Sequence, residues 1–93
     1  SVSPFYLRLS VVDEPGVLAR IAGILGTAGI GISSVFQPEA SSPGPVPLVL
    51  MIHDANYGAM LDALGKIRQL DCVSGEPALF HVERISEKPG GIG

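Results

Sequence analysis

The stretch Asp13-Glu14-Pro15-Gly16-Val17-Leu18 lies where an alternating apolar pattern ends and a helical one begins. Before it, apolar residues occupy every second position, as in a strand with one buried face: Phe5, Leu7, Leu9 and Val11. After it, apolar residues recur at helical spacing: Val17, Leu18, Ile21, Ile24, Leu25 and Ala28. The sequence therefore predicts a strand over about residues 5–12, a tight Pro-Gly corner, and a helix over about residues 16–28.

This corner has a functional interpretation as well as a structural one. The first N–H groups of a helix have no carbonyl partner within the helix, and the helix dipole adds partial positive charge there. A small anion such as a carboxylate is therefore stabilised at such a corner. In the structural alternative, Asp13 caps the helix and Gly16 only permits the turn.

Glycines and prolines mark the limits of the next elements. Gly29 is placed to end the first helix, because glycine accepts a left-handed conformation without steric cost. A second strand is predicted over residues 30–37 and a loop rich in proline and serine over residues 38–45. The third strand, residues 46–53, is apolar on both faces in the run Leu48 to Ile52. Such a run is typical of a central strand that is covered on both sides.

A second helix and a fourth strand complete the pattern. Asp54 is the predicted N-cap of the helix. The predicted buried stripe consists of Tyr57, Met60, Leu61, Leu64, Ile67 and Leu70. A turn is expected at residues 74–77 and the last strand over about residues 78–84.

The element order β-α-β-β-α-β predicts an α+β fold of the ferredoxin-like kind. In this βαββαβ sandwich, a four-stranded antiparallel sheet carries both helices on one face. The other face, with Tyr6, Arg8, Ser10 and Val12 on its first strand, is expected to be open or paired. We expect residues 1–4 to be a linker remnant, residues 5–84 the domain and residues 85–93 a flexible C-terminal tail. The start without methionine indicates a piece cut from a longer protein.

Composition excludes several classes of partner and chemistry. Six basic against nine acidic residues give a formal charge of −3, which argues against nucleic-acid binding. The single Cys72 cannot form an intramolecular disulfide or a cysteine metal cluster, and it fits a reducing cytoplasm. No apolar run approaches the roughly 20 residues that a membrane-spanning helix needs.

Catalytic motifs are also missing from the sequence. His53 and His81 fall on predicted strands without a metal-ligand spacing, so we expect both to be structural or surface histidines. Ser33-Ser34 lacks the context of a nucleophile elbow. We therefore expect a fragment that is not an enzyme, with no catalytic residue, metal or cofactor of its own.

Three segments together resemble an ACT domain: residues 5–9, the corner at residues 13–18 and residues 29–33. The strand over residues 48–53 continues the match, and the C-terminal regulatory domain of homoserine dehydrogenases is the most similar kind. The resemblance implies an allosteric module that binds a small amino acid and pairs with a second copy of itself. For this kind of domain it implies L-threonine as the effector, and NAD(P) as the cofactor of a catalytic part that the chain does not include.

The resemblance also implies a set of ligand-binding residues. The corner would contribute Asp13, Pro15, Gly16, Val17 and Leu18, with backbone N–H groups on the effector carboxylate and Asp13 facing its ammonium group. From the paired subunit, Ile32, Ser33 and Gln37 would supply further contacts.

One departure from the family pattern separates two hypotheses. Many ligand-binding ACT domains have asparagine at the position of Gly31, so a direct amide contact to the effector is missing here. The first hypothesis is an effector sensor that alters an attached catalytic domain. The second is an assembly module without a ligand, which the apolar third strand and Gly31 favour.

Overall fold

The alternating segment forms strand β1 (Val2–Val11), which lies inside the sheet between two antiparallel neighbours. The computed structural model describes residues 2–83. Every apolar residue of the predicted inner face of β1 is buried, while Arg8 on its other face is exposed. The pattern of period two thus decides which side of the sheet becomes the core.

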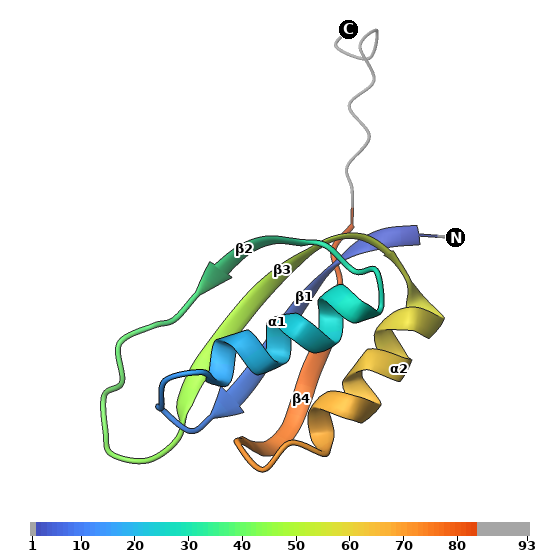
Figure 1. Ribbon diagram of the computed structural model, residues 1–93. Helices are drawn as coiled ribbons and strands as arrows, with labels where there is room; N and C mark the ends of the chain where they lie inside the picture. Colours follow the sequence, from blue (N-terminus) through green and yellow to red (C-terminus); the bar gives the residue numbers. More distant parts are fainter. Residues whose placement is uncertain (1, 84–93) are drawn as a thin grey trace, which may run out of the picture.

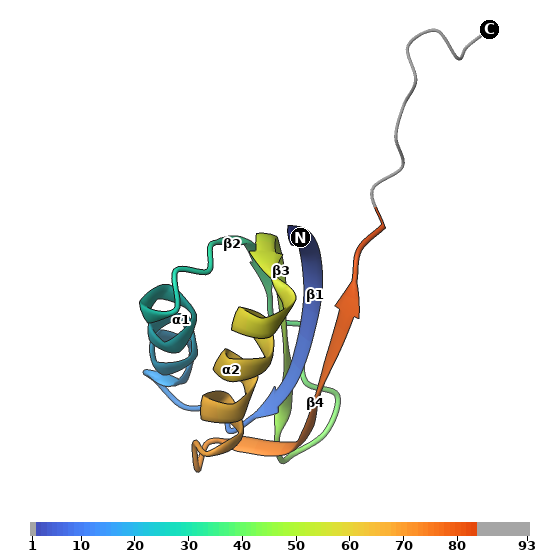
Figure 2. The ribbon, with the colours of Figure 1, turned by 90° about the vertical axis from the view of Figure 1, so that its right-hand side faces the viewer.

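The remaining elements follow in the predicted order (Figure 1). They are α1 (Val17–Thr27), β2 (Ile32–Phe36), β3 (Val46–Asn56), α2 (Tyr57–Arg68) and β4 (Val73–His81). The strands form one antiparallel sheet in the order β2-β3-β1-β4. Figure 2 shows both helices on the same side of this sheet. The predicted α+β, ferredoxin-like βαββαβ sandwich is confirmed.

The core lies between the sheet and the helices. Leu48, Leu50 and Ile52 of β3 face it and are at most 1% exposed. Helix α1 contributes Val17, Ile21 and Leu25, and α2 contributes Met60, Ala63, Leu64 and Ile67. On the first predicted stripe, Leu18 and Ile24 are only partly buried and Ala28 is exposed. Gly29 has a φ of +74°, as expected of the glycine that ends α1.

Two boundaries differ from the prediction at the ends of strands. β1 starts at Val2, so residues 2–4, expected to be a linker remnant, are part of the sheet. β3 continues to Asn56, so the prediction of Asp54 as the N-cap of α2 was wrong. The side chain of Asn56 accepts a hydrogen bond from the N–H of Ala59 at 3.2 Å and is the actual cap.

The second half of the chain shows two more differences. Tyr57 and Leu61 are 50% and 43% exposed, so the buried stripe of α2 turns toward Ala63 instead. The turn predicted at residues 74–77 is a bulge inside β4, where Gly75 has a φ of +67°. Arg84 and the tail at residues 85–93 lie outside the described residues.

The face of the sheet away from the helices has no covering layer among the described residues (Figure 2). Tyr6, Arg8 and Ser10 lie on it, as predicted for β1. On β3, Val49 and Met51 face the same way and are only partly buried. β3 is therefore central in the sheet, as predicted, but the chain itself covers only one of its two apolar faces.

Leu50 is the residue through which the core can be tested most directly. Its side chain is fully buried on β3, so Leu50→Asp would place an unpaired charge in the core and should abolish the cooperative unfolding transition. Leu61→Asp is the matched control, because Leu61 is 43% exposed on α2 and should retain a transition. Thermal melts followed by circular dichroism measure both. A native-like melt for Leu50→Asp would show that the inner face of β3 is not the core.

Candidate functional site

The Pro-Gly corner is built by the backbone that follows β1. The N–H of Val12 donates to the carbonyl of Cys72 at 2.8 Å, which ties the end of β1 to the residue before β4. The N–H of Glu14 then donates to the carbonyl of Val12 at 3.0 Å. Gly16 has a φ of +87°, a left-handed conformation that L side chains rarely adopt. The chain therefore turns sharply from strand to helix at Gly16.

Gly16 is the N-cap of α1, and no side chain caps this helix. The interpretation of Asp13 as the cap was therefore wrong. The N–H of Val17 makes a long bond of 3.4 Å to the carbonyl of Glu14, whereas those of Leu18 and Ala19 bond no carbonyl of residues 2–83. Two unpaired donors therefore mark the helix start, and that of Ala19 was not among the predicted groups.

A hollow of about 360 Å³ opens at this helix start. Its lining is Val12, Asp13, Glu14, Pro15, Gly16, Val17, Leu18 and Gln37. All predicted corner residues thus meet in one cavity, with the exposed carboxylates of Asp13 and Glu14 at its wall. Gln37 joins them from the same chain because it follows directly after β2, whose last residue is Phe36.

Ile32 and Ser33 lie at the other end of β2 and outside this corner hollow. Ser33 lines a separate hollow of about 350 Å³ together with Pro4, Met51, Ile52, His53 and Asp54. Its hydroxyl donates to the carbonyl of Met51 at 3.1 Å. Within one chain, the structure therefore divides the predicted ligand residues between two places.

β2 itself is an edge strand with apolar side chains in solvent. Val35 is 41% and Phe36 62% exposed, and the sheet order leaves one side of β2 without a neighbouring strand. Exposed apolar edges promote pairing with another strand, and proteins usually protect them. This edge is thus suited to pair with another chain.

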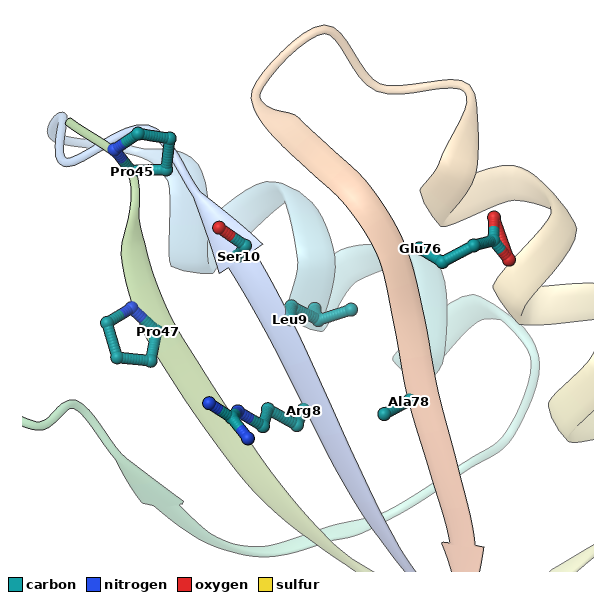
Figure 3. A pocket seen from close by; sticks show the side chains of 7 residues that line it. All are labelled: Arg8, Leu9, Ser10, Pro45, Pro47, Glu76 and Ala78. Atoms are coloured by element: carbon teal, nitrogen blue, oxygen red, sulfur yellow. The ribbon is translucent and has the colours of Figure 1, made fainter.

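A third hollow, of about 350 Å³, lies on the uncovered face of the sheet (Figure 3). It is lined by Arg8, Leu9, Ser10, Pro45, Pro47, Glu76 and Ala78. Figure 3 shows Glu76 extending from β4 toward α2, where it pairs with Arg68 at 3.2 Å. Arg8 has no acidic partner among the described residues. This hollow therefore holds no acid–base pair.

The two histidines lie on β3 and β4, as predicted. His81 shares a hydrogen bond of 3.0 Å between its Nδ1 and the hydroxyl of Ser3, and its ring lies 4.6 Å from that of Phe5. Between residues 2 and 83, no three His, Cys, Asp or Glu side chains lie close enough to hold a metal ion. No helix in that part of the chain has the length and apolarity to cross a membrane.

Comparison with known proteins relates the chain to one group of enzymes. It is 39% identical to a homoserine dehydrogenase of Pseudomonas aeruginosa over 85 residues, which are 90% of this chain and 20% of that protein. The crystal structure of a homoserine dehydrogenase from Thiobacillus denitrificans superposes with a TM-score of 0.79 at 32% identity, over 89% of this chain and 18% of the other. The chain thus spans about a fifth of the length of these relatives.

The fold alone is also shared more widely. The ACT domain from a GTP pyrophosphokinase of Chlorobium tepidum superposes with a TM-score of 0.67 at 18% identity, over 86% of this chain and all of that domain. No family model matches the chain.

The left-handed conformation of Gly16 yields a prediction for stability. Gly16→Ala should destabilise the domain by about 1 kcal/mol, because a Cβ disfavours this φ even though it would meet no atom within 4 Å. Gly23→Ala, inside α1 and equally free of contacts, should stabilise it by about 0.5–1 kcal/mol. Urea denaturation measures both changes. The same sign for the two variants would mean that the corner does not constrain Gly16.

Proposed function

Because the chain is an ACT domain that matches the C-terminal part of homoserine dehydrogenases, we propose that it is an amino-acid-binding regulatory domain. The observation that carries the proposal is the corner hollow, where unpaired N–H groups at the start of α1 stand beside two carboxylates. A free amino acid carries one negative and one positive group close together. A site with donors and acids side by side matches that charge pattern.

The effector carboxylate binds at the start of α1. The N–H groups of Leu18 and Ala19 point out of the first turn without a described partner, and the helix dipole adds partial positive charge. A carboxylate there is stabilised by about 0.3–1 kcal/mol when exposed and by up to about 2 kcal/mol when partly buried. The left-handed Gly16 keeps this turn open, since it brings no side chain into the hollow.

Asp13 binds the effector ammonium group. Its carboxylate lines the corner hollow, is exposed and makes no hydrogen bond or ion pair with residues 2–83. Since Asp13 does not cap α1, its charge is available for a ligand. Threonine is the favoured effector because of the match to homoserine dehydrogenases, and the proposed role is feedback control of threonine, methionine and isoleucine biosynthesis.

Two copies of the chain pair through their β2 edges. Antiparallel pairing of identical edges extends the sheet and covers apolar side chains that are exposed in one copy. The start of β2 in one copy then lies beside the end of β2 in the other. This arrangement brings Ile32 and Ser33 of one copy toward the corner of its partner, where Gln37 and Asp13 lie.

The whole protein in this proposal is a cytoplasmic, NAD(P)-dependent homoserine dehydrogenase, and this domain is its regulatory part without catalytic residues. Effector binding would change the geometry of the pair and so the attached catalytic domain, with a coupling of about 1–3 kcal/mol. A second candidate is an assembly module without a ligand, in the same or another enzyme of amino-acid metabolism. The exposed apolar edge of β2 favours it, since pairing alone explains that edge.

Asp13→Ala should weaken effector binding roughly tenfold, about the size of one charge-assisted contact of 1.4 kcal/mol. The melting temperature should stay unchanged, because Asp13 is exposed and caps no helix. Calorimetry of the chain with threonine, isoleucine, serine and lysine at millimolar concentration measures binding. If none of them gives heat or a thermal shift, the sensor proposal fails and the assembly module stands.

Phe36→Lys should dissociate the pair, because it places a charge in the edge that β2 presents to its partner. Phe80→Lys is a closely matched control: Phe80 is 57% exposed on the opposite edge strand β4, against 62% for Phe36 on β2. Sedimentation equilibrium of both variants measures the monomer fraction. Dissociation by Phe80→Lys alone would place the interface at β4 rather than β2.

A further inference from the structure

The hollow at the start of β2 has the composition of a small-molecule site. It combines a hydroxyl, an imidazole and a carboxylate, from Ser33, His53 and Asp54, with the apolar side chains of Pro4, Met51 and Ile52. Its volume of about 350 Å³ exceeds what a single amino acid needs and lies at the lower end of ligand-binding cavities. Polar groups on a mostly apolar wall are what a site needs to read one hydroxyl beside a methyl group.

His53 occupies the space above Gly31. The N–H of His53 donates to the carbonyl of Gly31 at 2.9 Å, so the two backbones are held together. A Cβ on Gly31 would lie 3.2 Å from Cδ2 of His53, tighter than most real contacts. Glycine at position 31 thus leaves room for the imidazole. A polar side chain is therefore present above this position, although it comes from β3 and not from residue 31.

The ring of His53 is available for a ligand. His53 is exposed, and its ring nitrogens make no hydrogen bond with residues 2–83. A neutral imidazole carries one donor and one acceptor, so it can pair with a hydroxyl in either sense. The hydroxyl of Ser33 donates to the carbonyl of Met51 and keeps its own lone pairs as acceptors.

The symmetry of the proposed pair brings this hollow to the corner of the partner. When two β2 strands pair antiparallel about Ser34, Ile32 of one copy lies opposite Phe36 of the other. Ser33 and His53 then approach the end of the partner's β2, which leads into the corner hollow at Gln37. Each pair of chains would contain two such composite sites.

We infer that His53, together with Ser33, reads the side-chain hydroxyl of the effector across the pair, while the corner of the other copy holds its carboxylate and ammonium. The inference rests on the proposed function and adds the ligand class: a small amino acid with a hydroxyl next to a methyl group. It also assigns separate tasks to the two hollows. Asp13 sets the affinity for any amino acid, and His53 sets the preference for a hydroxyl.

Threonine and valine form a matched pair of probes, because valine replaces the hydroxyl of threonine with a methyl group of similar size. Calorimetry of the 93-residue chain should show threonine binding more tightly than valine. His53→Ala should reduce that ratio about tenfold or remove it, and His53→Gln should keep part of it. Asp13→Ala should weaken both ligands and leave the ratio unchanged.

His81→Ala is the control, because His81 lies outside both hollows and should keep the ratio. Melting curves and sedimentation of each variant verify the fold and the pair. If the chain binds both ligands equally, or His53→Ala keeps the ratio, the inference about His53 is overturned and the proposed function stands. If neither ligand nor any other amino acid binds, the proposed function falls and the inference with it.

Discussion

Strand β1 is the constraint on which the other parts of this domain depend. It lies between β3 and β4, its inner face is buried along its whole length, and it ends in the turn that starts α1. Shifting its register by one residue would exchange a buried apolar face for one that carries Arg8. The same register that buries Leu7 and Leu9 also delivers Asp13 and Gly16 to one end of the sheet. Core and corner are therefore set by one strand.

Features carried by neighbouring residues could be predicted from the sequence, and features that depend on distant contacts could not. The alternation of β1 and the Pro-Gly corner are local, and the structure has both. Asp54 was a reasonable cap by residue type, but pairing with β1 extends β3 to Asn56, and a cap must follow the strand. Gly75 looked like a turn residue for the same local reason. Its positive φ instead makes a bulge, because Ser74 already pairs with Ser10 of β1.

The candidate site divides in the same way. The corner residues are contiguous, so their meeting in one hollow follows from the turn itself, and Gln37 joins them because β2 ends beside the start of α1. The contact between Gly31 and His53 joins residues on two strands. Residue 31 alone indicated a missing polar group, whereas the pairing of β2 with β3 shows which other side chain occupies that space. Only the register of the two strands contains this information.

A site shared between two copies has a thermodynamic consequence for regulation. If the corner of one chain and the β2 hollow of the other hold the same ligand, the ligand binds the pair more tightly than the single chain. Binding and association then favour each other by the same coupling free energy. The exposed Phe36 and Val35 make the pair favourable but leave β2 only five residues long. A short edge of this kind provides limited pairing energy, so a ligand contribution of 1–3 kcal/mol would be large enough to change how the two copies sit together.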